Sequence, residues 1–72
     1  MELKYFPGKK VRIVDDEGME YEGLAWDYVH PDDNEPEGVE GIILDNLIRA
    51  DGRHYENPIL FNAPNIKSIE VI

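Results

Sequence analysis

The chain contains no cysteine, no threonine and a single serine, Ser68. Without cysteine, neither a disulfide nor a thiolate metal ligand can stabilise the fold, and a reducing compartment fits this composition. Covalent catalysis needs an activated serine, cysteine or threonine beside a base. Ser68 lies between Lys67 and Ile69 in a stretch typical of a strand, where we expect it to face solvent. These absences argue against an enzyme that uses a nucleophilic side chain.

Long apolar runs are also missing. No stretch approaches the roughly 18 apolar residues of a membrane span, and the start, MELKYFPGKK, lacks the apolar centre of a signal peptide. We therefore expect a cytoplasmic protein with no membrane partner. With 72 residues, the chain predicts one domain, residues 1–72, because so short a chain buries only about 60% of its unfolded surface. A deep substrate cavity does not fit beside one modest core, so we expect no enzyme.

Basic residues are few and unevenly placed. Seven lysines and arginines stand against sixteen acidic residues, which gives a net charge of -9, and no basic residue occurs between Arg12 and Arg49 apart from His30. A field of this sign repels phosphate backbones and favours cationic partners. The net charge therefore disfavours nucleic acid, although one local basic patch is present near the start: Lys4, Lys9, Lys10 and Arg12.

Alternating apolar and polar residues predict short strands at 9–15, 19–26, 39–44, 54–61 and 66–72. The segment 16–18 (DEG) supplies a turn, and Asp51-Gly52 is a strong hairpin signal. Pro58 indicates an edge or a bulge. No helical stripe is present. Five short strands joined by turns predict an all-β fold, a small, strongly bent five-stranded barrel.

The second predicted strand changes phase at Gly23. Beyond this glycine, Leu24 and Trp26 take the parity that glutamates hold before it. A glycine at such a change predicts a bulge or a sharp bend. We expect Trp26 and Phe61 to lie in the core. In the closing strand, Ile69 and Val71 should pack inward, whereas Ile72 has the opposite parity and should face away from the core. Ile72 is thus a candidate for self-association.

The stretches GKKVRIVDDEGMEYEG and NIKSIEVI resemble the Sm-like (LSm) proteins, a branch of the SH3-like barrels. In that family a glycine-bent second strand passes through both halves of a five-stranded barrel. The closing strand carries isoleucines around a short turn, as Ile66, Ile69 and Ile72 do here. The resemblance implies ring assembly by edge-strand pairing and RNA binding through loops at the pore.

The chain departs from the family at the positions that are used for RNA binding in family members. Family members place an aspartate about six residues after the bend glycine, and an asparagine follows it. Here Asp27 comes four residues after Gly23, and the next asparagine is Asn34. An arginine-glycine pair before the last strand is replaced by FNAPN. No base-binding residue is therefore transferred, and a general SH3-like barrel describes the pattern equally well.

The segment 30–41 (HPDDNEPEGVEG) is the most acidic part of the chain. If a calcium loop began at Asp33, its twelfth position would be Leu44, which cannot ligate calcium. His30 and Asp32 are two ligands, fewer than zinc sites normally use. We therefore expect a charged loop between the second and third strands, with no metal and no cofactor.

Tyr28 borders this loop, and we expect it to be an exposed aromatic residue at a partner surface with Asp27, Asp32 and Asp33. Such a surface suits a peptide that bears lysine or arginine. The sequence thus predicts a non-catalytic interaction module that binds protein partners or associates with itself as a homo-oligomer. The alternative is an Sm-like RNA-binding protein that uses the N-terminal basic patch.

Overall fold

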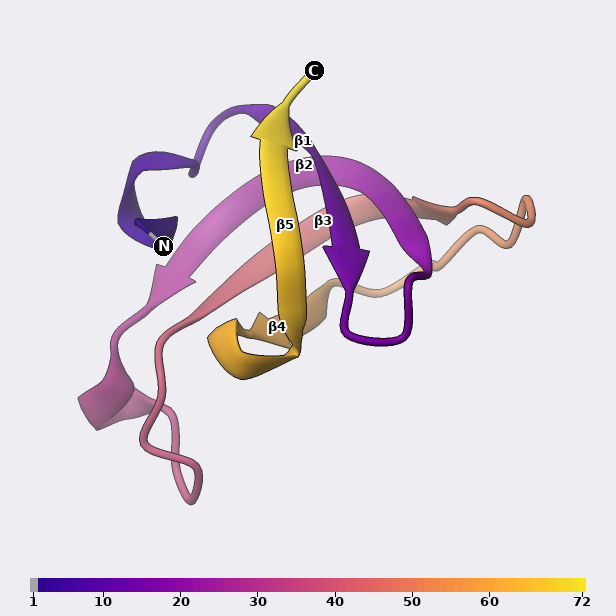
Figure 1. The fold of residues 1–72 in the computed structure, drawn as a ribbon. Coiled ribbons are helices and arrows are strands. Elements are labelled where there is room, and N and C mark those ends of the chain that lie inside the picture. The colour runs from indigo at the N-terminus through magenta and orange to yellow at the C-terminus, as the bar shows by residue number, and fades with distance from the viewer. Residues whose placement is uncertain (1) are drawn as a thin grey trace.

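Five strands form one antiparallel sheet in a computed structural model, which describes residues 2–72 (Figure 1). The strand order across the sheet is β4-β3-β2-β1-β5. The strands are β1 (Lys10–Asp15), β2 (Glu20–Val29), β3 (Gly41–Arg49), β4 (Ile59–Asn62) and β5 (Ile66–Val71), and three single 3-10 turns are η1 (Leu3–Tyr5), η2 (Pro31–Asp33) and η3 (Ala63–Asn65). The prediction of a small, strongly bent five-stranded all-β fold is confirmed. In the described part of the chain, no helix is long and apolar enough to cross a membrane.

The predicted turn after β1 forms because Asp15 and Gly18 suit it. The Asp15 carboxylate accepts the backbone N–H groups of Glu17 (2.9 Å) and Met19 (2.8 Å). Gly18 has a φ of 85°, a value that L side chains rarely adopt. The turn joins β1 to β2 in register, so that Val11 lies opposite Gly23 and Ile13 opposite Tyr21.

The predicted hairpin at Asp51-Gly52 also forms. The Arg49 N–H donates to the Arg53 carbonyl at 2.8 Å, and Gly52 has a φ of 92°. The Arg49 guanidinium donates to the Asp51 carboxylate (Nε to Oδ1, 2.9 Å) and lowers the pKa of Asp51 to about 2. The predicted fourth strand, 54–61, is wrong in its first half. Regular pairing resumes only after Pro58, which has no N–H to donate.

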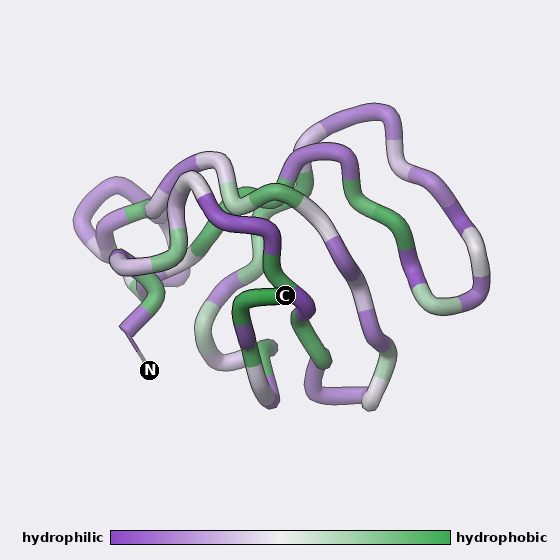
Figure 2. The backbone as a smooth tube through the Cα atoms, turned by 90° about the horizontal axis from the view of Figure 1, so that it is seen from above, coloured by the Kyte–Doolittle hydropathy of each residue, from purple (hydrophilic) through white to green (hydrophobic). Residues whose placement is uncertain are grey.

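The core lies on the inner side of the bent sheet. Its buried apolar residues are Leu3, Val11, Ile13, Ala25, Ile42, Leu44, Leu47, Phe61 and Ile66. Phe61 is buried as predicted and meets Tyr21 edge to face, with ring centroids 5.1 Å apart. Seen from above, hydrophobic residues recur along the strands, whereas hydrophilic residues dominate the projecting loops (Figure 2).

Trp26 is 61% exposed, so its predicted place in the core is wrong. Ala25 faces the buried core, so its neighbour Trp26 faces the outer side by simple alternation. A β-bulge in β2 follows: Ala25 lies opposite Leu44 and Asp27 lies opposite Ile43, which leaves Trp26 as an extra residue. At such a bulge two successive side chains, here those of Trp26 and Asp27, share one face. Asp27 therefore joins Trp26 on the outer side of the sheet.

Gly23 lies at a second bulge, as predicted, but the phase of the strand does not change there. Tyr21, Gly23 and Ala25 all face the inner side, and the phase changes at Trp26 instead. Opposite Gly23, the β3 strand carries an extra residue, because the pairing steps from Ile48 to Asp45. A Cβ at Gly23 would lie 2.9 Å from the Asp45 carbonyl oxygen and 3.4 Å from the Leu47 Cα. Glycine is therefore required for close approach and not for a positive φ.

The closing strand packs inward only in part. Ile66 is buried and Ile69 is half-buried, but Val71 is 55% exposed, which corrects the expectation that it packs inward. Val71 lies opposite Val11, on the inner side of the sheet. It stays exposed because β5 is the last strand of the sheet, and no further strand in residues 2–72 covers it. Ser68 is exposed, as predicted.

Candidate functional site

The outermost strands, β4 and β5, each have a neighbour on one side only within residues 2–72. Just beyond β5, the Ile72 N–H donates to the Lys10 carbonyl at 2.9 Å. Backbone groups alternate in direction along an antiparallel strand. The N–H and C=O groups of Ile69 and Val71 therefore point away from β1, towards the free edge.

The same reasoning applies to β4. The Ala63 N–H donates to the Glu40 carbonyl at 2.9 Å, in the register that places Asn62 opposite Gly41. By alternation, the backbone groups of Leu60 and Asn62 point away from β3. Each edge thus presents two residues whose main-chain groups are directed outward.

Apolar side chains accompany both edges. Leu60 is 42% exposed on β4, and Ile72 is 42% exposed just beyond β5. Ile72 has the parity of Glu70, which pairs with Arg12 on the outer side, so Ile72 faces away from the core as predicted. An open strand edge with apolar residues is an arrangement that proteins normally cover.

Tyr28 differs from the exposed aromatic residue that the sequence predicts. The bulge at Trp26 turns Tyr28 to the inner side, opposite the buried Ile42, and it packs against the core. Its hydroxyl donates to a Glu40 carboxylate oxygen at 3.0 Å. Burial first, and then this hydrogen bond, raises the pKa of Tyr28. The tyrosine is therefore a structural residue of the loop base.

The three aspartates of the predicted partner surface are exposed but belong to two elements. Asp27 lies on the outer side of β2, whereas Asp32 and Asp33 lie in η2 beyond the end of that strand. The Asp32 N–H donates to Nδ1 of His30 at 3.2 Å. Among residues 2–72, no group of three His, Cys, Asp or Glu residues is close enough to hold a metal ion.

Asn34 anchors the acidic loop, and the sequence reasoning missed this role. Its side chain is buried and donates to the Val39 carbonyl (2.8 Å) and to Oδ1 of Asn62 (2.7 Å). The loop is thereby attached to the end of β4. The available signal was one amide side chain between Asp33 and Glu35 in an otherwise charged segment.

The predicted basic patch is smaller than its sequence suggests. Arg12 donates to Glu22 (2.8 Å) and to Glu70 (3.1 Å), and these carboxylates raise its pKa. Its charge is thus balanced locally. The exposed lysines Lys4, Lys9 and Lys10 remain, and within residues 2–72 none of them has a carboxylate oxygen within 4.0 Å.

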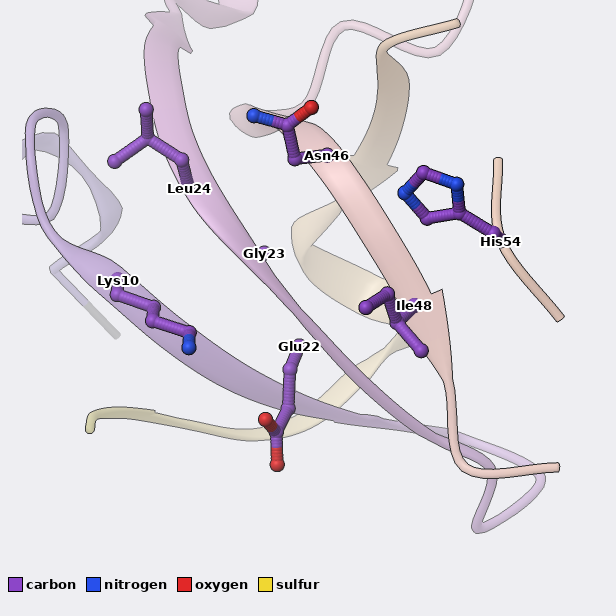
Figure 3. Close-up of a pocket in the computed structure, with 7 residues that line it drawn as sticks. All are labelled: Lys10, Glu22, Gly23, Leu24, Asn46, Ile48 and His54. Carbon is purple, nitrogen blue, oxygen red and sulfur yellow. The ribbon is translucent and has the colours of Figure 1, made fainter. Parts of the chain in front are cut away.

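The outer side of the sheet is hollowed between β2 and β3. A depression of about 360 Å³ is lined by Lys10, Glu22, Gly23, Leu24, Asn46, Ile48 and His54 (Figure 3). A second depression of about 270 Å³ shares Glu22 and Ile48 with the first, so the two adjoin, and we call them together the groove. The sequence reasoning missed it because it placed Trp26 in the core and gave Leu24 the same parity as Trp26.

A scan against protein-family models and a search of the curated proteins found no match. Among solved structures, the chain is similar to the crystal structure of a novel Sm-like archaeal protein from Pyrobaculum aerophilum, with a TM-score of 0.75 and 21% sequence identity. The match covers 99% of this chain and 48% of that protein, so this chain spans about half its length. The fold is therefore Sm-like, and the resemblance seen in the sequence is confirmed at the level of fold.

Proposed function

We propose that this protein is a non-catalytic interaction module of the cytoplasm, which assembles with copies of itself and binds other proteins. The observation that carries the self-association is the pair of free edges, β4 and β5, at the two ends of one sheet. Pairing of β4 in one copy with β5 in the next uses two different surfaces. Such a contact repeats from copy to copy and forms a ring if the rotation closes.

Three features of the edges support this pairing. Each edge offers two residues with outward main-chain groups, Leu60 and Asn62 on β4 and Ile69 and Val71 on β5, which suits a short antiparallel ladder. The apolar side chains at the edges would leave water on assembly. Ile72 faces outward beside the β5 edge, where it can contact the neighbouring copy.

A second candidate function is RNA binding through Lys4, Lys9 and Lys10, which is favoured by their lack of carboxylate partners in the described structure. Arg12 does not strengthen this patch, because its charge is balanced by glutamates. Affinity that depends on phosphates should fall steeply as salt rises. Titration of a labelled oligouridylate at several salt concentrations tests this function.

Multi-angle light scattering, measured over protein concentration and salt, tests self-association. We expect a homo-oligomer that is more stable at about 0.1 M than at about 0.01 M salt, because the shorter Debye length screens the repulsion between acidic copies. Ile72→Asp should give a monomer whose melting temperature is close to that of the wild type. Ala50→Asp adds the same charge at the exposed hairpin, far from both edges in the sheet, and should remain oligomeric. A wild-type protein that stays monomeric at high micromolar concentration across this salt range would contradict the proposal.

A further inference from the structure

The outer side of the sheet carries large apolar residues that the core does not use. Trp26 is the most exposed of them, and Leu24 and Ile48 are 41% and 49% exposed. All three lie on β2 and β3, away from the free edges of β4 and β5. Exposed tryptophan is costly in water and is enriched among the residues that dominate binding energy in protein interfaces.

Two carboxylates lie beside these apolar residues. Asp45 is the cross-strand partner of Leu24, and Asp27 follows Trp26 in the bulge, on the same outer side. Within residues 2–72, neither carboxylate has a lysine, arginine or histidine nitrogen within 4.0 Å. We call the five residues Leu24, Trp26, Asp27, Asp45 and Ile48 the outer patch.

The groove continues the outer patch along β2. Its first depression has Gly23 in its floor and the side chains of Leu24 and Ile48 in its walls (Figure 3). The groove extends from Leu24 to Glu20, four residues along the strand. At a rise of about 3.3 Å per residue this is about 13 Å, the length of an extended segment of about four or five residues.

The indole and the two carboxylates of the outer patch favour a cationic occupant, whereas the adjoining groove has both basic and acidic residues in its lining. A guanidinium or ammonium group can lie on the face of an indole, and the attraction grows when water is excluded. At the outer patch, the same cation would also lie near the carboxylates of Asp27 and Asp45. A second copy of this chain is a poor occupant of this position, because with seven basic against sixteen acidic residues it offers few cations to place over the indole.

We propose that the outer patch docks an extended segment of another protein in which an arginine or lysine lies next to an apolar residue. The cation lies over Trp26 between Asp27 and Asp45, and the apolar side chain enters the depression between Leu24 and Ile48. The proposal rests on the proposed function in naming the class of protein partner. It is separable from self-association, because the patch lies outside both free edges.

Binding of three short peptides of equal length tests the proposal. In these peptides leucine alternates with arginine, with serine or with glutamate. Trp26 is the only tryptophan in the chain, so its fluorescence reports on the patch directly. We expect the arginine peptide to change Trp26 emission and to bind, and the glutamate and serine peptides to bind at least about tenfold more weakly. Equal binding of all three peptides would overturn the proposal.

Matched variants separate the patch from the general acidity of the chain, with the fluorescence anisotropy of a labelled arginine peptide as the readout. The double variant Asp27→Asn/Asp45→Asn should weaken binding by roughly tenfold, and Trp26→Ala by a similar factor. The double variant Asp32→Asn/Asp33→Asn removes the same charge from the acidic loop and should weaken binding by about twofold or less. Equal losses in the two double variants would overturn the proposal, since binding would then follow net charge.

Two further measurements complete the test: peptide binding by the Ile72→Asp variant, and Trp26 emission in the presence of an oligouridylate. The Ile72→Asp variant should bind the arginine peptide as the wild type does, even if the wild type never assembles. A loss of peptide binding in Ile72→Asp would show that the patch is not a site on one subunit, and the proposal would fail. An oligouridylate that changes Trp26 emission, where the arginine peptide does not, would assign the patch to nucleic acid and also overturn it.

Discussion

In the middle of β2, the two sides carry residues of opposite size. The inner side carries Gly23 and Ala25, both buried, whereas the outer side carries Leu24 and Trp26, both exposed. The strand arches across the molecule (Figure 1), and β3 approaches it closely on the inner side, where a Cβ at Gly23 would meet backbone atoms. Space on the inner side therefore decides which residues fit between Tyr21 and Tyr28. In this middle part of the strand the large apolar residues, Leu24 and Trp26, lie on the solvent-exposed side.

Residues on the two sides of β2 are therefore under different constraints. Inner residues are held by packing, so a change of volume there alters the free energy of unfolding. Outer residues have few neighbours to lose, so a change there should leave stability almost unchanged, and under our proposal it should alter binding. Substitutions on the two sides of one strand distinguish these constraints.

The largest effect is expected on the inner side. Gly23→Val places a Cβ 2.9 Å from the Asp45 carbonyl oxygen, and adds two methyl groups against Leu47. We expect a loss of about 3 kcal/mol in the free energy of unfolding, from overpacking and displacement of β3. Denaturant unfolding followed by circular dichroism measures it. The control Leu24→Val introduces valine at the next, exposed position and should cost under about 0.5 kcal/mol. Equal stability of the Gly23→Val variant and the wild type would show that β3 does not approach β2 closely.

The smallest effect on stability is expected on the outer side. A buried tryptophan replaced by alanine costs about 3–5 kcal/mol, but Trp26→Ala should change the free energy of unfolding by at most about 0.5 kcal/mol. The same denaturant experiment measures this change. A loss near that of a buried tryptophan would mean that Trp26 packs inside, as the sequence pattern suggested, and would remove the outer patch.

The parts of the fold that the sequence predicts are those governed by local rules. The turn after Asp15 and the hairpin at Gly52 were predicted because glycine is needed where φ is positive. Five strands followed from alternation and turn residues, and the order of those features resembled the Sm-like proteins. Phe61 was placed correctly in the core, and Ile72 was correctly predicted to face away from it.

The errors arise where the chain gains one residue relative to its partner strand. A bulge is set by the pairing of two strands, and the alternation of a single strand does not reveal it. At Gly23 the extra residue lies in β3, so β2 keeps its alternation and Trp26 faces outward. At Trp26 the extra residue lies in β2 and turns Tyr28 inward, so the sequence pattern places both aromatic residues on the wrong side. The two bulges together explain why the aromatic residue of the candidate protein-binding surface is Trp26 and not Tyr28. The buried hydrogen bonds of Asn34 join segments distant in sequence, which no local pattern shows.

The central claim, that copies pair through β4 and β5, is tested most directly by hydrogen exchange at single-residue resolution. The backbone amides of Leu60 and Asn62 on β4, and of Ile69 and Val71 on β5, point to the free edges. In the assembled wild type these four amides should exchange as slowly as those of the central strands. In monomeric Ile72→Asp they should exchange at least about tenfold faster, while the amides of β2 remain protected. Fast exchange of the four edge amides in the assembled wild type would contradict the claim, because the copies would then associate through another surface.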